Sequence, residues 1–101
     1  MYDIRFKGKV KKKFKKFLQR LSPNVKAKIK NTLHNYPYPS PTHGDTLCKV
    51  ERKGLLYGIE PTGGDRILYD IITIEDNKKI VLIHSVGNDD EEIRYLKKYA
   101  K

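Results

Sequence analysis

The sequence predicts an α+β fold. An N-terminal strand and an antiparallel two-helix hairpin pack on a three- to four-stranded antiparallel sheet, and a C-terminal helix follows. Two observations predict this class. Apolar residues recur at helical spacing as far as Tyr36, whereas the later segments are short, rich in β-branched and aromatic residues, and separated by turns. The length of 101 residues suits one domain, so residues 1–101 are expected to form a single domain.

The first half of the chain is predicted as a strand, two helices and a loop. Residues 2–6 alternate apolar and polar side chains, which is the period of a half-buried strand. Apolar residues then follow one helical stripe over 10–21, and Ser22-Pro23 supplies an N-cap and a first helical residue for the second helix. Two helices with so short a connection are expected to be antiparallel. The prolines of 36–44 predict a loop.

The second half is predicted as short strands and a last helix. The expected strands cover residues 47–52, 55–60, 66–74 and 79–86. The last helix is expected to begin with the acidic run 89–92 and to end with Lys97, Lys98 and Lys101, an order that matches the helix dipole.

The charges divide the chain into two unequal halves. Residues 1–53 carry fifteen basic and three acidic side chains, whereas residues 54–101 carry seven basic and nine acidic ones. No carboxylate occurs between Asp3 and Asp45. A fold does not need this asymmetry, which costs self-repulsion and points to a polyanionic partner. The residues expected to bind nucleic acid are Lys11, Lys12, Lys13, Lys15, Lys16, Lys49, Arg52 and Lys53.

Composition also indicates what the protein lacks. No apolar run approaches the ~20 residues that cross a bilayer, and no signal segment precedes the first lysines, so we expect a cytoplasmic protein without a membrane partner. Lysine-rich amphipathic helices can also lie on anionic membranes, but these apolar stripes are expected to pack in a core. A single cysteine, Cys48, and three scattered histidines form no zinc pattern, so neither metal nor cofactor is expected.

Three motifs lie on consecutive predicted strands: LLYGI at 55–59, GDRILY at 64–69, and IVLI at 80–83 leading to Val86-Gly87. Together with the order of elements and a tyrosine on the last helix, they resemble the RelE/ParE toxin superfamily of type II toxin–antitoxin pairs. The resemblance covers most of the chain.

The resemblance implies a function. Many members bind the ribosomal A site and cut messenger RNA there, by attack of a ribose 2′-OH on the adjacent phosphate. Others poison DNA gyrase, and members are normally held inactive by a cognate antitoxin. RNA cleavage needs a group that removes the 2′-OH proton, cations that stabilise the phosphorane and an acid for the leaving oxygen.

Four residues are candidates for catalysis. Arg66 matches the Gly-x-Arg of the family, where a guanidinium would hold the scissile phosphate; otherwise it pairs with Asp65 or Glu60. Tyr95 matches a functional tyrosine of one branch, or else packs in the last helix. Other branches use His, Glu or Asp as the base, which makes Glu60 and the loop residue His43 candidates. Asp65 and His84 could serve the same scheme, although a histidine in the last strand is more simply a buried core residue.

The sequence departs from the family where that branch keeps lysines and a basic residue after Val-Gly. Gly58 and Glu60 stand at the lysine positions, and Asn88, Asp89 and Asp90 follow the glycine. A phosphate pocket with carboxylates in place of cations would repel its substrate, so the lysine-driven mechanism is not expected.

Three hypotheses follow. The first is a ribosome-associated messenger RNA endonuclease neutralised by an antitoxin. The second is the same fold without nuclease activity, as a gyrase inhibitor or a degenerate toxin. The third is a basic RNA- or DNA-binding module.

Overall fold

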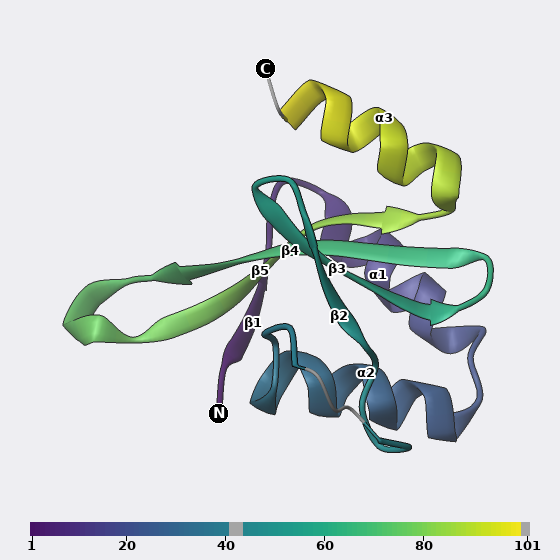
Figure 1. The fold of residues 1–101 in the computed structure, drawn as a ribbon, viewed down its shortest axis with the longest axis horizontal. Helices are drawn as coiled ribbons and strands as arrows, with labels where there is room; N and C mark the ends of the chain where they lie inside the picture. Colours follow the sequence, from purple (N-terminus) through teal and green to yellow (C-terminus); the bar gives the residue numbers. More distant parts are fainter. Residues whose placement is uncertain (41–43, 100–101) are drawn as a thin grey trace.

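The computed structural model describes residues 1–40 and 44–99, which form a sheet with helices on both faces (Figure 1). The strands are β1 (Asp3–Phe6), β2 (Val50–Lys53), β3 (Leu56–Thr62), β4 (Asp65–Thr73) and β5 (Lys79–Gly87). The helices are α1 (Val10–Gln19), α2 (Pro23–Asn35) and α3 (Asp89–Tyr99), and a short turn η1 (Glu75–Asn77) joins β4 to β5. The predicted α+β class is confirmed.

The sheet differs from the predicted one. Its five strands follow the order β1-β5-β4-β3-β2, and β1 runs parallel to β5 while the other neighbours are antiparallel. The N-terminal strand therefore belongs to the sheet, which is mixed and larger than the expected three or four antiparallel strands. The physical reason is that β5 pairs with β4 on one side only, so β1 satisfies the backbone groups of its other edge.

Helices α1 and α2 form over the predicted residues, but the predicted hairpin is matched only roughly, because their main contacts are with the sheet. The helix α2 begins at Pro23, and the Ser22 hydroxyl accepts a hydrogen bond from the Val25 backbone N–H at 3.4 Å. Three residues separate α1 from α2; α1 contacts β5, and α2 contacts β1 and β3. Within the described ranges, no helix is both long and apolar enough to cross a bilayer.

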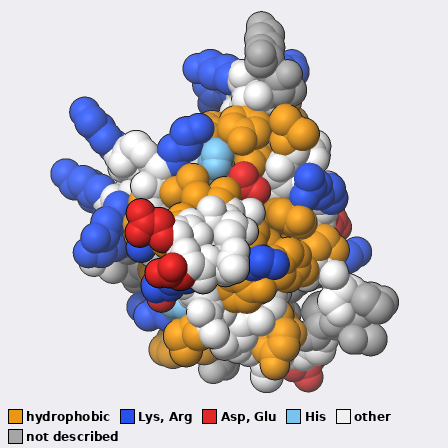
Figure 2. All heavy atoms as spheres, turned by 90° about the vertical axis from the view of Figure 1, so that its left-hand side faces the viewer, with side chains coloured by type: hydrophobic (Ala, Val, Ile, Leu, Met, Phe, Trp, Pro, Cys, Tyr) orange, Lys and Arg blue, Asp and Glu red, His pale blue; other side chains and the backbone are white. Residues whose placement is uncertain are grey.

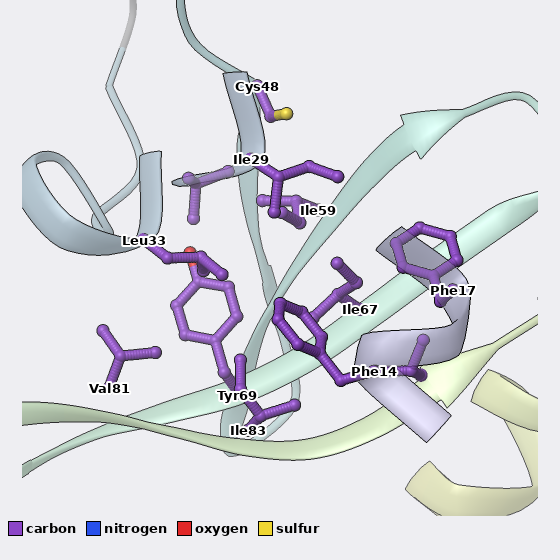
Figure 3. Close-up of a cluster of buried hydrophobic side chains, with 12 residues drawn as sticks. Phe14, Phe17, Ile29, Leu33, Cys48, Ile59, Ile67, Tyr69, Val81 and Ile83 are labelled. Atoms are coloured by element: carbon purple, nitrogen blue, oxygen red, sulfur yellow. The ribbon is translucent and has the colours of Figure 1, made fainter. Parts of the chain in front are cut away.

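The main core lies between these two helices and one face of the sheet (Figure 3). Its fully buried side chains include Leu33 of α2, which lies beside Tyr69 of β4, and Ile29 of α2, which lies beside Ile59 of β3. The Tyr69 hydroxyl donates a hydrogen bond to the Pro37 carbonyl at 3.0 Å, so the ring spans the core and holds the segment after α2. The apolar layer holds one face of α1 against the core, so the opposite face of α1 is exposed to solvent.

The other face of the sheet is partly covered by α3, which packs on β4 and β5 (Figure 1). The β4–β5 register shifts here, since Leu68 lies opposite Ser85 and Tyr69 lies opposite Ile83. His84 is therefore the extra residue of a β-bulge, and both His84 and Ser85 lie on the α3 side. A bulge of this kind turns a side chain toward a face of the sheet that the same residue would not reach in a regular strand.

The core makes a direct prediction about the Tyr69 hydroxyl. Replacing Tyr69 by Phe keeps the ring but leaves the Pro37 carbonyl without its donor, which should lower the free energy of unfolding by about 1–2 kcal/mol. Urea denaturation with an unchanged m-value would measure this loss. Tyr36→Phe is the matched control, because that ring is 60% exposed and should change stability little. Equal stability of wild type and Tyr69→Phe would contradict the prediction.

Candidate functional site

Five lysines, Lys11, Lys12, Lys13, Lys15 and Lys16, form what we call the lysine surface of α1. All five are exposed on the side of α1 opposite Phe14 and Phe17, which are buried in the core. Lys13 pairs with Glu91, and no other member of the surface has a carboxylate within 4 Å in the part of the chain that the structure describes. The first turn of α1 contains no acidic residue, although a helix dipole favours negative charge there. Helix stability alone therefore does not explain these lysines.

Basic side chains gather along one side of the molecule in Figure 2, which also shows apolar and acidic side chains elsewhere on that face. The remaining predicted nucleic-acid-binding residues lie on or beside β2, at the opposite edge of the sheet from β1. Lys49 and Lys53 each lie within 3.6 Å of the Glu51 carboxylate, and Arg52 stacks 4.5 Å from the Tyr57 ring centre. These three cations are engaged within the chain, unlike most of the lysine surface.

Arg66 lies at the start of β4 between two carboxylates. Its Nε is 3.3 Å from Glu60 Oε1 and 3.7 Å from Asp89 Oδ1, and its side chain is only 13% exposed. The guanidinium also donates to the carbonyls of Gly63 at 3.3 Å and Asp65 at 3.0 Å. We call Glu60 and Asp89 the carboxylate clamp of Arg66. In this arrangement the two carboxylates of the clamp neutralise the positive charge of Arg66, which a phosphate would otherwise bind.

A second buried charge lies beside the clamp. Glu92 of α3 is 5% exposed, and its Oε1 lies 3.9 Å from the Lys53 ammonium. Lys53 reaches this position across Gly58, where an added Cβ would lie 2.9 Å from Lys53 Cγ. Burial raises the pKa of Glu92, and the charges of Lys53 and Arg66 only partly oppose that effect.

Tyr95 meets His84 on the α3 side of the sheet. The Tyr95 hydroxyl and His84 Nδ1 are 2.8 Å apart, and the Tyr99 ring lies 5.1 Å from the imidazole. Burial and the nearby charge of Lys7 lower the pKa of His84, while burial and Tyr99 raise the pKa of Tyr95. Both groups are therefore neutral near pH 7, and the two shifts together favour this neutral hydrogen-bonded pair over a tyrosinate–imidazolium pair.

The structure brings some candidates together and separates others. Arg66 and Glu60 are in contact, whereas Tyr95 belongs to the His84 pair. Asp65 accepts a hydrogen bond from Thr62, which indicates a turn role, and His43 lies outside the described residues. Among the described residues, no three His, Cys, Asp or Glu side chains are grouped to hold a metal ion.

Sequence reasoning missed the His84–Tyr95 pair, because the two residues lie on different elements and the bulge that turns His84 toward α3 has no local signature. The available signal was a pair of consecutive polar residues, His84 and Ser85, within an otherwise apolar strand at 79–86.

No family model, curated protein or solved structure matches this chain.

The buried Glu92 predicts an unusual dependence of stability on pH. Its pKa is raised in the folded state above the ordinary 4.5, so between the two values the folded chain binds more protons than the unfolded chain. The free energy of unfolding should therefore fall as pH rises through this window, relative to a Glu92→Gln variant that cannot titrate. Urea denaturation of both proteins between pH 4 and pH 7 would measure the difference.

The control for this experiment is Glu75→Gln, which removes an exposed carboxylate at the tip of the β4–β5 hairpin. The Glu75→Gln variant should follow the pH dependence of the wild type. A stability difference between wild type and Glu92→Gln that stays constant over this pH range would contradict the prediction.

Proposed function

We propose that this chain is a RelE-like toxin: a cytoplasmic, ribosome-associated messenger RNA endoribonuclease that a cognate antitoxin neutralises. The observation that carries the proposal is the lysine surface of α1, which is exposed, largely free of carboxylate partners and unnecessary for the helix itself. The motifs on β3, β4 and β5 and the order of the elements support the family resemblance.

The lysine surface is the part that docks on ribosomal RNA. Each lysine that contacts a phosphate releases counterions, so this binding is strong at low salt and independent of base sequence. An acidic antitoxin would cover the same charges, and the two partners would then compete. Docking brings the α3 face of the sheet to the messenger RNA.

The chemistry rests on groups of that face. Arg66 would bind the scissile phosphate through two N–H groups once substrate displaces the carboxylate clamp. Tyr95, hydrogen-bonded to His84, would accept the 2′-OH proton while its own proton passes to the imidazole. The imidazolium would then return a proton through Tyr95 to the leaving 5′-oxygen, which restores both groups. Glu60 is the alternative base, since it lies beside Arg66.

One observation favours a second candidate function. Glu60 and Asp89 keep Arg66 neutralised, and an anionic substrate must separate them from the guanidinium before it can bind. A protein with this fold but without nuclease activity, such as a gyrase inhibitor or a degenerate toxin, would keep these contacts permanently. A plain RNA- or DNA-binding module would need the lysine surface alone.

Induced expression in growing cells separates these candidates. Rapid arrest of translation with cleaved transcripts supports the endoribonuclease, whereas a DNA-damage response indicates gyrase. The absence of toxicity, together with retained RNA binding, would indicate the binding module.

Neutralising the lysine surface should weaken ribosome binding. In the variant Lys11→Gln, Lys12→Gln, Lys15→Gln, the slope of log affinity against log salt should become shallower by roughly two units, at about 0.7–0.9 per lost phosphate contact. The matched control is Lys30→Gln, Lys79→Gln, Lys97→Gln, which removes three exposed lysines from other elements. Sedimentation with ribosomes at several salt concentrations measures both. Equal slopes for the two variants would remove α1 as the docking surface.

Arg66 should be needed for toxicity but not for ribosome docking. Arg66→Ala should abolish transcript cleavage and growth arrest, because no other guanidinium occupies that place, while ribosome sedimentation stays unchanged. Arg5→Ala is the control, since Arg5 is an exposed arginine of β1. Circular dichroism and urea denaturation establish that both variants fold. Undiminished toxicity of a folded Arg66→Ala protein would exclude Arg66 from the site.

A further inference from the structure

A groove follows the seam between α1 and α3 and has not entered the proposed function. It consists of two hollows on either side of Glu91, of about 290 Å³ and about 260 Å³. The first lies between α1 and the start of α3, and the second lies between β5 and the middle of α3. We call the two hollows together the seam groove. Glu91 is the residue that they share, and its ion pair with Lys13 crosses the seam.

The lining of the seam groove is predominantly cationic. Its basic residues are Lys13, Lys16, Arg20, Arg94 and Lys98, against the two carboxylates of Asp65 and Glu91. Both carboxylates are already engaged. Asp65 accepts the Thr62 hydroxyl and lies 3.9 Å from the Arg20 guanidinium, and Glu91 pairs with Lys13. Arg94 and Lys98 are one helical turn apart on α3, and neither has a carboxylate within 4 Å in the described part of the chain. The seam groove therefore offers positive charge on both sides of Glu91.

The remaining lining distinguishes between anionic ligands. Its aliphatic and phenyl side chains, Val86 and Phe17, are each only 2% exposed, so neither offers a pocket for an anchoring side chain. Protein partners usually need such an anchor, whereas nucleic-acid interfaces are polar and positively charged. Ser85 in the second hollow carries a hydroxyl that can hydrogen-bond to ribose or phosphate oxygens, whereas the Tyr95 hydroxyl is already bonded to His84. These features favour a nucleic-acid backbone.

We propose that the seam groove binds the phosphodiester backbone of single-stranded RNA, with one phosphate in each hollow and the Glu91 carboxylate as a restraint between them. The inference rests on the proposed function and deepens it, because it gives the path of a single strand beside the lysine surface, with which the seam groove shares Lys13 and Lys16. Lys16 and Arg20 hold one phosphate, and Arg94 and Lys98 hold the other.

Glu91 is held in place by its neighbours. Its Oε1 accepts the Asn88 backbone N–H at 3.1 Å, and Asn88 Oδ1 accepts the Glu91 backbone N–H at 2.9 Å, which is a capping box at the start of α3. Lys13 and the Asn88 N–H lower the pKa of Glu91, so the residue is charged at neutral pH. The charge competes with a phosphate for Lys13 and repels phosphates on both sides.

The test measures binding of a ten-nucleotide oligouridylate to the purified chain at several salt concentrations. Glu91→Gln keeps the capping box, since Gln serves at that position as well as Glu, but removes the charge. Its affinity for oligouridylate should rise on the order of five-fold, the upper range for release of an exposed ion pair. Asp90→Asn, which removes an exposed neighbouring carboxylate, is the matched control and should raise the affinity much less.

Removing the cations of the second hollow should instead weaken the binding of oligouridylate and reduce its dependence on salt. In Arg94→Gln, Lys98→Gln the salt slope for oligouridylate should become shallower by about 1.4 units, at about 0.7 per contact with a single strand. Lys30→Gln, Lys79→Gln removes the same charge from two exposed sites elsewhere and should leave the slope nearly unchanged.

Three outcomes would overturn the proposal: equal effects of Glu91→Gln and Asp90→Asn, equal slopes for the two double variants, or a polyglutamate peptide that binds the groove as tightly as oligouridylate. The proposed function is tested separately, because ribosome sedimentation of the Lys11→Gln, Lys12→Gln, Lys15→Gln variant reports on three lysines that do not line the groove. If ribosome binding and transcript cleavage persist but oligouridylate does not bind the groove, this inference alone is discarded. Loss of ribosome binding with intact oligouridylate binding would discard the proposed docking instead.

Discussion

The contacts of α3 with the rest of the molecule depend on how the helix begins. Asn88 and Glu91 exchange side-chain and backbone hydrogen bonds there, and Gly87 leaves them room, since an added Cβ would lie 2.6 Å from the Glu91 carboxyl carbon. A helix advances by 3.6 residues per turn, so fixing its first turn also fixes which side chains face the sheet. The side chains placed in this way are Asp89, Glu92 and Tyr95, which meet Arg66, Lys53 and His84.

The two faces of the sheet carry opposite electrostatic arrangements. On the side of α1 and α2 the core is apolar, and the cations point outward from α1 into solvent. On the side of α3, carboxylates from β3 and α3 lie beside Arg66 and Lys53 of the sheet, so the charges of these two cations are balanced within the chain. Balanced charge contributes to the placement of α3, and unbalanced charge is available to a partner. Electrostatics therefore supports binding by α1 more directly than it supports chemistry at Arg66.

Local signals made much of the fold predictable from the sequence. The start of α2 could be predicted from Ser22-Pro23, and the amphipathic stripe of α1 predicted both its buried and its charged side. The pairing of β1 with β5 could not be predicted, because alternation indicates a strand without indicating its neighbour. The mixed sheet could therefore be recognised only from the three-dimensional structure.

The candidate site was predictable in its residue types more than in its contacts. The sequence left open a pairing of Arg66 with Asp65 or Glu60, and the structure places Glu60 3.3 Å from Arg66, together with Asp89. The pairing of Tyr95 with His84 depends on a bulge in β5, which follows from the register of two strands and not from any short motif. Cap residues act over three or four positions, whereas such contacts depend on distant segments that meet only after folding.

The missing side chain at Gly58 limits how this sheet could change over evolution. The Lys53 stem crosses the space above Gly58, and Leu68 lies on the other side, 3.3 Å from where a Cβ would stand. Any larger side chain at position 58 would collide with the stem of Lys53. Acquiring one would require Lys53 to move, and Glu92 would then lose its cation while still buried. A larger residue at this position therefore needs coordinated substitutions, and the single substitution alone would be unfavourable.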